Sequence, residues 1–144
     1  MEKISLNFHL KLQEMCDCYM ETDFLAEIRH MTTQETTDQE EAAMKYLALS
    51  ILHTITEQAK KLSFKRKGPE VTVKMKNTKK ELLPAPSLEI FNKIVEIMRS
   101  ILHLHEEKGE LPFSLGLRTG EVNLEVKIKR EEDKESVKFK FPVS

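Results

Sequence analysis

The sequence is poor in glycine and in aromatic residues, and both shortages narrow the chemistry it can support. It contains four glycines, no tryptophan, two tyrosines and seven phenylalanines in 144 residues. Loops that wrap phosphate groups need closely spaced glycines, and no G-x-G-x-x-G, P-loop or G-x-S-x-G motif occurs. The scarcity of aromatic residues argues against a large surface for stacking bases. We find no catalytic constellation, so the sequence leans against an enzyme, and we expect no cofactor.

Cysteine is also scarce, and its spacing excludes the common structural roles. Cys16 and Cys18 are separated by one residue, so a disulfide between them would close a small, strained ring. Zinc sites built on cysteine usually need two C-x₂-C pairs, so we expect no metal. Free thiols, no run of about 18 apolar residues and no signal-peptide pattern at the N-terminus together predict a cytoplasmic protein without a membrane segment.

The histidines form no recognisable metal motif. His103 and His105 would face opposite ways on a helix. His53 with Glu57, and His103 with Glu107, are spaced as surface pairs on helices, each contributing a few tenths of a kcal/mol. The alternative is a carboxylate–imidazole metal site between two neighbouring helices. We favour the surface pairs.

Positive charge is concentrated in one segment, and this is the feature that stands out. Residues 60–80 hold nine of the 23 Lys and Arg residues and one acid, Glu70, for a net charge of +8. Residues 1–59 have a net charge of −7 and residues 81–144 of −2. A concentrated cationic field can attract a polyanion even when the whole chain is nearly neutral.

This basic segment is the candidate binding site. A hairpin bearing cations can contact nucleic-acid phosphates and release their counterions, but it can equally be a solvated edge hairpin protected by lysine. An acidic protein, or this chain's own acidic N-terminal half, is a further possible partner. The candidate nucleic-acid or anion-binding residues are Lys61, Lys65, Arg66, Lys67, Lys74, Lys76, Lys79 and Lys80.

The first half of the chain predicts a strand followed by helices. Apolar residues alternate strictly between Ile4 and Leu12, which favours a half-buried strand with His9 on its wet face. A short helix is expected near 22–31. Thr37 followed by Glu40 has capping-box spacing, and the helix that follows, to about residue 62, is apolar on nearly all sides.

The second half predicts a hairpin, a helix and a strand meander. The period changes to two after Leu62, with a turn at Gly68-Pro69. Ser87 caps a second long helix, which we expect to end at Lys108-Gly109. Three alternating segments follow between residues 113 and 141, joined at Thr119-Gly120 and at a charged tip.

This order predicts one α+β domain over residues 1–144, a two-layer sandwich. A mostly antiparallel sheet of five to six strands would be covered on one face by two long helices. The helix after Thr37 then has apolar surface left over, which favours self-association as a homo-oligomer. The alternative is that residues 13–31 cover it. The candidate self-association residues are Met44, Leu47, Ile51 and Ile55.

Two functions follow as hypotheses. The first is a non-enzymatic cytoplasmic domain that acts through self-association or protein–protein contacts. The second is a nucleic-acid-binding protein that uses the basic hairpin 60–80. An enzyme with a small cleft is a third class, for which the sequence offers no residues.

Overall fold

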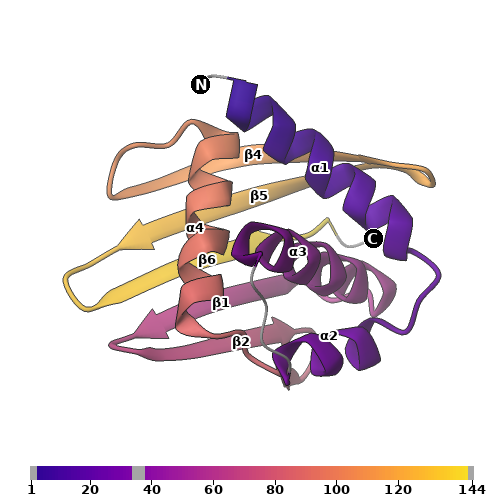
Figure 1. The fold of residues 1–144 in the computed structure, drawn as a ribbon, viewed down its shortest axis with the longest axis horizontal. Coiled ribbons are helices and arrows are strands. Elements are labelled where there is room, and N and C mark those ends of the chain that lie inside the picture. The colour runs from indigo at the N-terminus through magenta and orange to yellow at the C-terminus, as the bar shows by residue number, and fades with distance from the viewer. Residues whose placement is uncertain (1–2, 34–37, 143–144) are drawn as a thin grey trace.

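The computed structural model describes residues 3–33 and 38–142, and all four helices found there lie on one face of a six-stranded antiparallel sheet (Figure 1). This confirms the α+β sandwich, with four covering helices in place of two. In chain order the elements are α1 (Lys3–Tyr19), α2 (Phe24–Thr32), α3 (Gln39–Thr56), β1 (Lys61–Lys67), β2 (Glu70–Lys76), β3 (Lys80–Leu83), α4 (Leu88–Leu102), β4 (Lys108–Leu117), β5 (Gly120–Arg130) and β6 (Lys134–Lys140).

The first and the last strands of the chain, β1 and β6, are neighbours at the centre of the sheet. Its order is β3-β2-β1-β6-β5-β4, so β1 pairs with β6 although α4 and four strands separate them in the chain. The register places Leu62 opposite Phe139 and Phe64 opposite Val137, and all four side chains are buried under the helices. The predicted hairpin 62–75 is thereby placed edge to edge with the C-terminal hairpin.

The segment predicted as an N-terminal strand is helical, and that prediction was wrong. An alternating pattern also has apolar residues at every fourth position, so it fits one face of a helix as well as one face of a strand. The continuation decides between the two, because Phe8, Leu12 and Cys16 form a buried stripe at helical spacing. Leu10, which a strand would bury beside Leu12, is 56% exposed.

α1 also seals the outer edge of β4. The His9 Nε2 donates to the Ser114 carbonyl at 2.8 Å, and the Gln13 Oε1 accepts from the Gly116 amide at 2.7 Å. One turn further on, the Asp17 carboxylate accepts from the amide of Arg118 at 3.0 Å. Three side chains spaced four residues apart thus satisfy backbone carbonyl and amide groups at this edge, which could otherwise pair with a strand of another molecule. His9 therefore does not face solvent as the strand prediction required.

α3 is the central helix of the helical layer. It packs against α1, α2, α4 and β1, and its N-cap is Asp38; Thr37, the expected capping residue, lies outside the described residues. Met44, Leu47 and Ile51 are buried and Ile55 is half-buried within the single chain. The premise that this helix has an uncovered apolar face was wrong, because α1 and α2 supply the cover. Self-association stays a prediction, without the surface on which it was based.

The remaining elements follow the sequence patterns with two differences. Ser87 caps α4, as expected, Asp23 caps the short helix α2, and the hairpin turns at Gly68-Pro69. α4 ends at Leu102 rather than near Gly109, because His103 adopts the left-handed conformation (φ 54°), and Lys108 already begins β4. An unexpected short strand, β3, replaces the misassigned N-terminal strand in the count of six. None of the helices in the described ranges is both long and apolar enough to cross a membrane.

Candidate nucleic-acid interface

The sheet face opposite the helices is dominated by lysine. Strand side chains alternate between the two faces, and the apolar ones point to the helices, so their neighbours in sequence point away. We call this open surface the lysine face. Its lysines, from all six strands, are Lys61, Lys65, Lys67, Lys74, Lys76, Lys80, Lys108, Lys127, Lys129, Lys134, Lys138 and Lys140.

The strand register aligns these lysines in rows across the sheet. Lys80, Lys76, Lys61 and Lys140 are successive partners on β3, β2, β1 and β6. A neighbouring row includes Lys74 on β2, then Lys138 and Lys127 on β6 and β5. Adjacent strands are about 4.8 Å apart, and alternate residues along a strand are about 6.6 Å apart. The cations therefore form a two-dimensional array rather than a single line.

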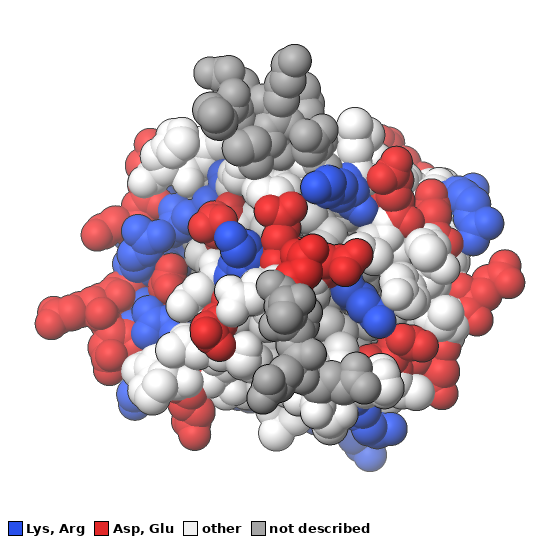
Figure 2. Space-filling model, viewed as in Figure 1, with Lys and Arg blue, Asp and Glu red and all other residues white. Residues whose placement is uncertain are grey.

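The charge of the lysine face is strongly positive. Four glutamates share the surface (Glu70, Glu110, Glu121 and Glu125), so twelve lysines leave a net charge of +8. The whole chain has a net charge of −1, which means that everything else sums to −9. The helix-covered side mixes acidic and basic side chains without a patch of one sign (Figure 2). The molecule is therefore polarised across its thickness.

Most of the lysine face is unneutralised. Within the described part of the chain, one of its twelve lysines forms an ion pair, Lys129 with Glu131 at 3.8 Å. The acids of α1, α2 and α3 lie on the other side of the sheet, so the N-terminal half does not cover this surface. A hollow of about 420 Å³ opens between β2, β1, β6 and β5, with Lys65, Lys74 and Lys138 among its lining residues.

Lys138 lies at the centre of the array, and its titration reflects its neighbours. Partial burial lowers the pKa of its ammonium group, and the charges of Lys65, Lys127, Lys61 and Lys129 lower it further. The folded state therefore binds this proton less tightly than the unfolded chain does. The resulting loss of stability is fully present below the folded pKa and disappears as pH rises toward the ordinary value of 10.5.

Replacing Lys138 by Gln is expected to stabilise the fold at neutral pH and low salt. Lys138 faces Lys127 directly across β6 and β5, and like charges at opposite positions cost about 0.2–1 kcal/mol. Urea denaturation should show a gain of this size that shrinks at high salt and toward pH 10. Lys79→Gln, at an exposed position between β2 and β3, is the matched control and should change nothing. Equal effects for the two variants would contradict the repulsion.

Seven of the eight residues predicted to bind anions lie on or beside the lysine face, and the eighth, Arg66, does not. Six of them lie on the lysine face: Lys61, Lys65, Lys67, Lys74, Lys76 and Lys80. Lys79 is exposed beside it in the β2–β3 connection. Six lysines of β4, β5 and β6 were missed, because only the non-local pairing of β1 with β6 brings them alongside. The alternation of lysine in residues 127–129 and 138–140 was the available signal.

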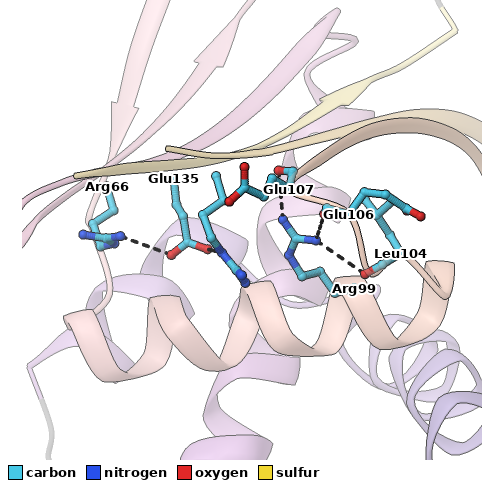
Figure 3. A network of polar contacts seen from close by, with 7 residues as sticks. Arg66, Arg99, Leu104, Glu106, Glu107 and Glu135 are labelled. Carbon is cyan, nitrogen blue, oxygen red and sulfur yellow. Dashed lines mark hydrogen bonds and ion pairs between the residues drawn. The ribbon is translucent and has the colours of Figure 1, made fainter. Parts of the chain in front are cut away.

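Arg66 lies on the opposite, helix-facing side of the sheet. Its Nη2 donates to the Glu135 carboxylate at 3.3 Å, and the other oxygen of Glu135 accepts from Arg130 Nε at 3.2 Å (Figure 3). Arg66 alternates with Lys65 along β1, so it cannot share the face of that lysine. It links β1 to Glu135 of β6, which Arg130 of β5 also contacts, and it does not belong to the lysine face.

Arg99 of α4 forms a second polar anchor next to this network (Figure 3). Its guanidinium donates to the carbonyls of Leu104, Glu106 and Glu107, which fixes the connection between α4 and β4. Burial lowers the pKa of Arg99, and the charge of Arg130 lowers it further. These arginines are engaged in structure, in contrast to the lysines of the open face.

The cysteines and histidines do not converge on a site. Cys16 is buried, and burial followed by the charge of Asp17 raises the pKa of its thiol to about 12, which keeps it protonated and unreactive. Cys18 is exposed. His53 lies under β3, 3.7 Å from the Glu81 carboxylate, rather than pairing with Glu57. In the described ranges, no group of three or more His, Cys, Asp or Glu side chains is arranged to hold a metal ion.

Comparison with known proteins adds no further assignment. No protein-family model matches the sequence, and no curated protein matches it. The lysine face is therefore the feature of this protein from which a function can be inferred.

Proposed function

We propose that the protein is a non-enzymatic nucleic-acid-binding domain that contacts phosphate groups through the lysine face. The observation that supports this is the array itself: twelve lysines and four glutamates on one face of the sheet. Each phosphate neutralised by a lysine releases condensed counterions, which is the main source of sequence-independent affinity for nucleic acid.

The cost of holding like charges together supports a binding role over a solvated surface. Lysine on an edge strand protects a sheet against aggregation, but β1, β6 and β5 are interior strands whose edges are already paired. Cross-strand lysine pairs such as Lys138–Lys127 and Lys61–Lys140 destabilise the fold. A bound polyanion would remove this repulsion, so binding and folding would reinforce each other.

The proposal predicts a steep dependence of affinity on salt. A complex in which six lysines contact phosphates has a slope of log K against log salt of about −5 on duplex DNA, and its affinity falls about a thousand-fold between 50 and 200 mM salt. Fluorescence anisotropy with a labelled 20-bp duplex of arbitrary sequence would measure both quantities. Absence of binding at 20 mM salt, or a slope shallower than −2, would reject phosphate contact by this face.

We further propose a cytoplasmic setting, supported by the state of the cysteines. Cys16 and Cys18 are both free, and a buried free thiol suits a reducing compartment. Self-association stays a prediction. Sedimentation of the free protein and of its complex would give the number of copies that bind, which the salt slope alone does not provide.

A further inference from the structure

We propose that the lysine face prefers double-stranded over single-stranded nucleic acid, contacting phosphates of both strands and reading no bases. This inference rests on the proposed function and names the partner class of the same site. Three features of the face support it: the absence of aromatic side chains, the two-dimensional arrangement of the lysines, and the exclusion of arginine.

The first feature is that the face offers nothing on which a base could stack. The phenylalanines of the strands, Phe64, Phe113 and Phe139, are buried on the helix-facing side. Besides lysine and glutamate, the outward positions of the strands hold small polar residues, Leu82, Pro112 and glycine. Proteins that bind single strands without sequence preference gain about 1–3 kcal/mol per stacked base. That contribution is missing here, so a single strand would be held by charge alone.

The second feature is the shape of the array. A row of four lysines on β3, β2, β1 and β6 spans about 14 Å across the sheet, and parallel rows extend it along the strands. A single strand can follow one line of these lysines. A duplex presents two phosphate strands on either side of a groove, so it can neutralise lysines from two rows at once.

The third feature is that the face is made for charge and not for reading sequence. Sequence readout relies on arginine forks and on asparagine or glutamine amides facing base edges. Arg66 and Arg130 belong to the network on the other side of the sheet, and the Asn123 side chain is hydrogen-bonded to Ser114 at 2.6 Å. Lysine acts as a flexible point charge, so we expect affinity to be nearly independent of sequence.

Glutamates and sheet twist make an anionic membrane a poorer fit. Glu125 follows Lys140 in one row, and Glu110 follows Lys127 in the next, so acids interrupt two of the rows at β5 and β4, and only the row of Lys129 continues onto β4, at Lys108. Neighbouring strands rotate by about 20–25°, so the lysines of β3 and those of β6 point in clearly different directions. A twisted, bounded array fits the curved surface of a duplex better than a flat bilayer.

Parallel titrations with duplexes, a single strand and vesicles test the preference for double-stranded nucleic acid. The full chain is titrated at 100 mM salt with duplex DNA, duplex RNA and single-stranded oligothymidylate of equal phosphate number, and with vesicles containing phosphatidylserine. We expect both duplexes to bind at least tenfold more tightly than the single strand, because a duplex makes more contacts and has a steeper salt slope per contact. Two duplexes of unrelated sequence should agree within about threefold.

The other outcomes separate the two proposals. If the single strand binds as tightly as the duplexes, or if sequence changes duplex affinity tenfold, the inference is overturned while nucleic-acid binding by the lysine face stands. If no nucleic acid binds even at 20 mM salt, both are overturned. Binding of the vesicles alone would likewise overturn both and would assign the lysine face to an anionic lipid surface.

Discussion

Reversing three lysines on the lysine face is expected to lower duplex affinity about a thousand-fold at 50 mM salt, with the fold intact. The proposed variant combines Lys65→Glu, Lys76→Glu and Lys129→Glu, from β1, β2 and β5. Three lost phosphate contacts at about 0.9 logarithmic units per decade of salt account for this loss. The slope of log K against log salt should become shallower by about 2.7. Anisotropy titrations between 20 and 200 mM salt would measure both.

These positions are chosen so that the variant should remain folded. Lys65 faces Thr72 and Ser136, Lys76 faces Lys61 and Lys80, and Lys129 faces Ser136 and Lys108. None of the three faces an acid across a strand, and Lys76 and Lys129 face lysines, so at these two positions glutamate replaces cross-strand repulsion by attraction. Among the described residues, one ion pair is lost, that of Lys129 with Glu131; the like charges that replace it are both exposed, so the change costs little. Thermal unfolding of the free variant should therefore resemble that of the parent or lie above it.

A matched control changes the net charge by the same amount on the other side of the molecule. Lys11, Arg29 and Lys93 lie on α1, α2 and α4. Replacing all three by glutamate also lowers the net charge of the protein by six. If the affinity for nucleic acid depends only on the net charge of the protein, both variants will lose affinity equally. If it binds the lysine face, the control should retain affinity within about threefold. Equal losses would contradict the site.

Except for the short strand β3, the regular elements after residue 20 could be predicted because local patterns determine them. Asp23 and Ser87 accept hydrogen bonds from the first turns of α2 and α4, and Gly68 has the positive φ of 57° that its turn requires. The end of α4 was missed because a histidine, and not a glycine, adopts the left-handed conformation there. The cover of α3 by α1 and α2 agrees with the alternative that the sequence offered, residues 13–31, and not with the preferred one, while the order of the sheet was hidden from the sequence.

Of the lysine face, only the part that is local in sequence could be predicted. The hairpin of β1 and β2 is local in sequence, so its lysines could be assigned to one face by alternation alone. The lysines of β5 and β6 join them only through the pairing of β1 with β6, in which Lys61 meets Lys140. That pairing brings together residues far apart in the chain, and no period in the sequence encodes it. Arg66 shows the converse, since charge density grouped it with lysines from which strand alternation separates it.

Alternation misled the prediction most at the N-terminus, and paired alanine substitutions in α1 test the corrected assignment. Leu12 is fully buried and Leu10 is 56% exposed, on a helix that packs against α3 and β4. Leu12→Ala should cost about 2–5 kcal/mol of unfolding free energy, since it removes a buried side chain and leaves a cavity. Leu10→Ala should remain within about 0.5 kcal/mol of the parent, because alanine suits an exposed helical position at least as well.

The pair is decisive because the two geometries predict opposite results from the same two residues. On a strand, positions 10 and 12 point to the same face and would lose comparable stability. On a helix they are 200° apart, given 3.6 residues per turn, so only one can be buried against α3. For a domain of this size the loss at Leu12 corresponds to a fall in Tm of about 5–20 °C. Comparable falls in Tm for the two variants would support a strand at this segment. They would also contradict the hydrogen bonds by which His9, Gln13 and Asp17 of α1 cover the edge of β4.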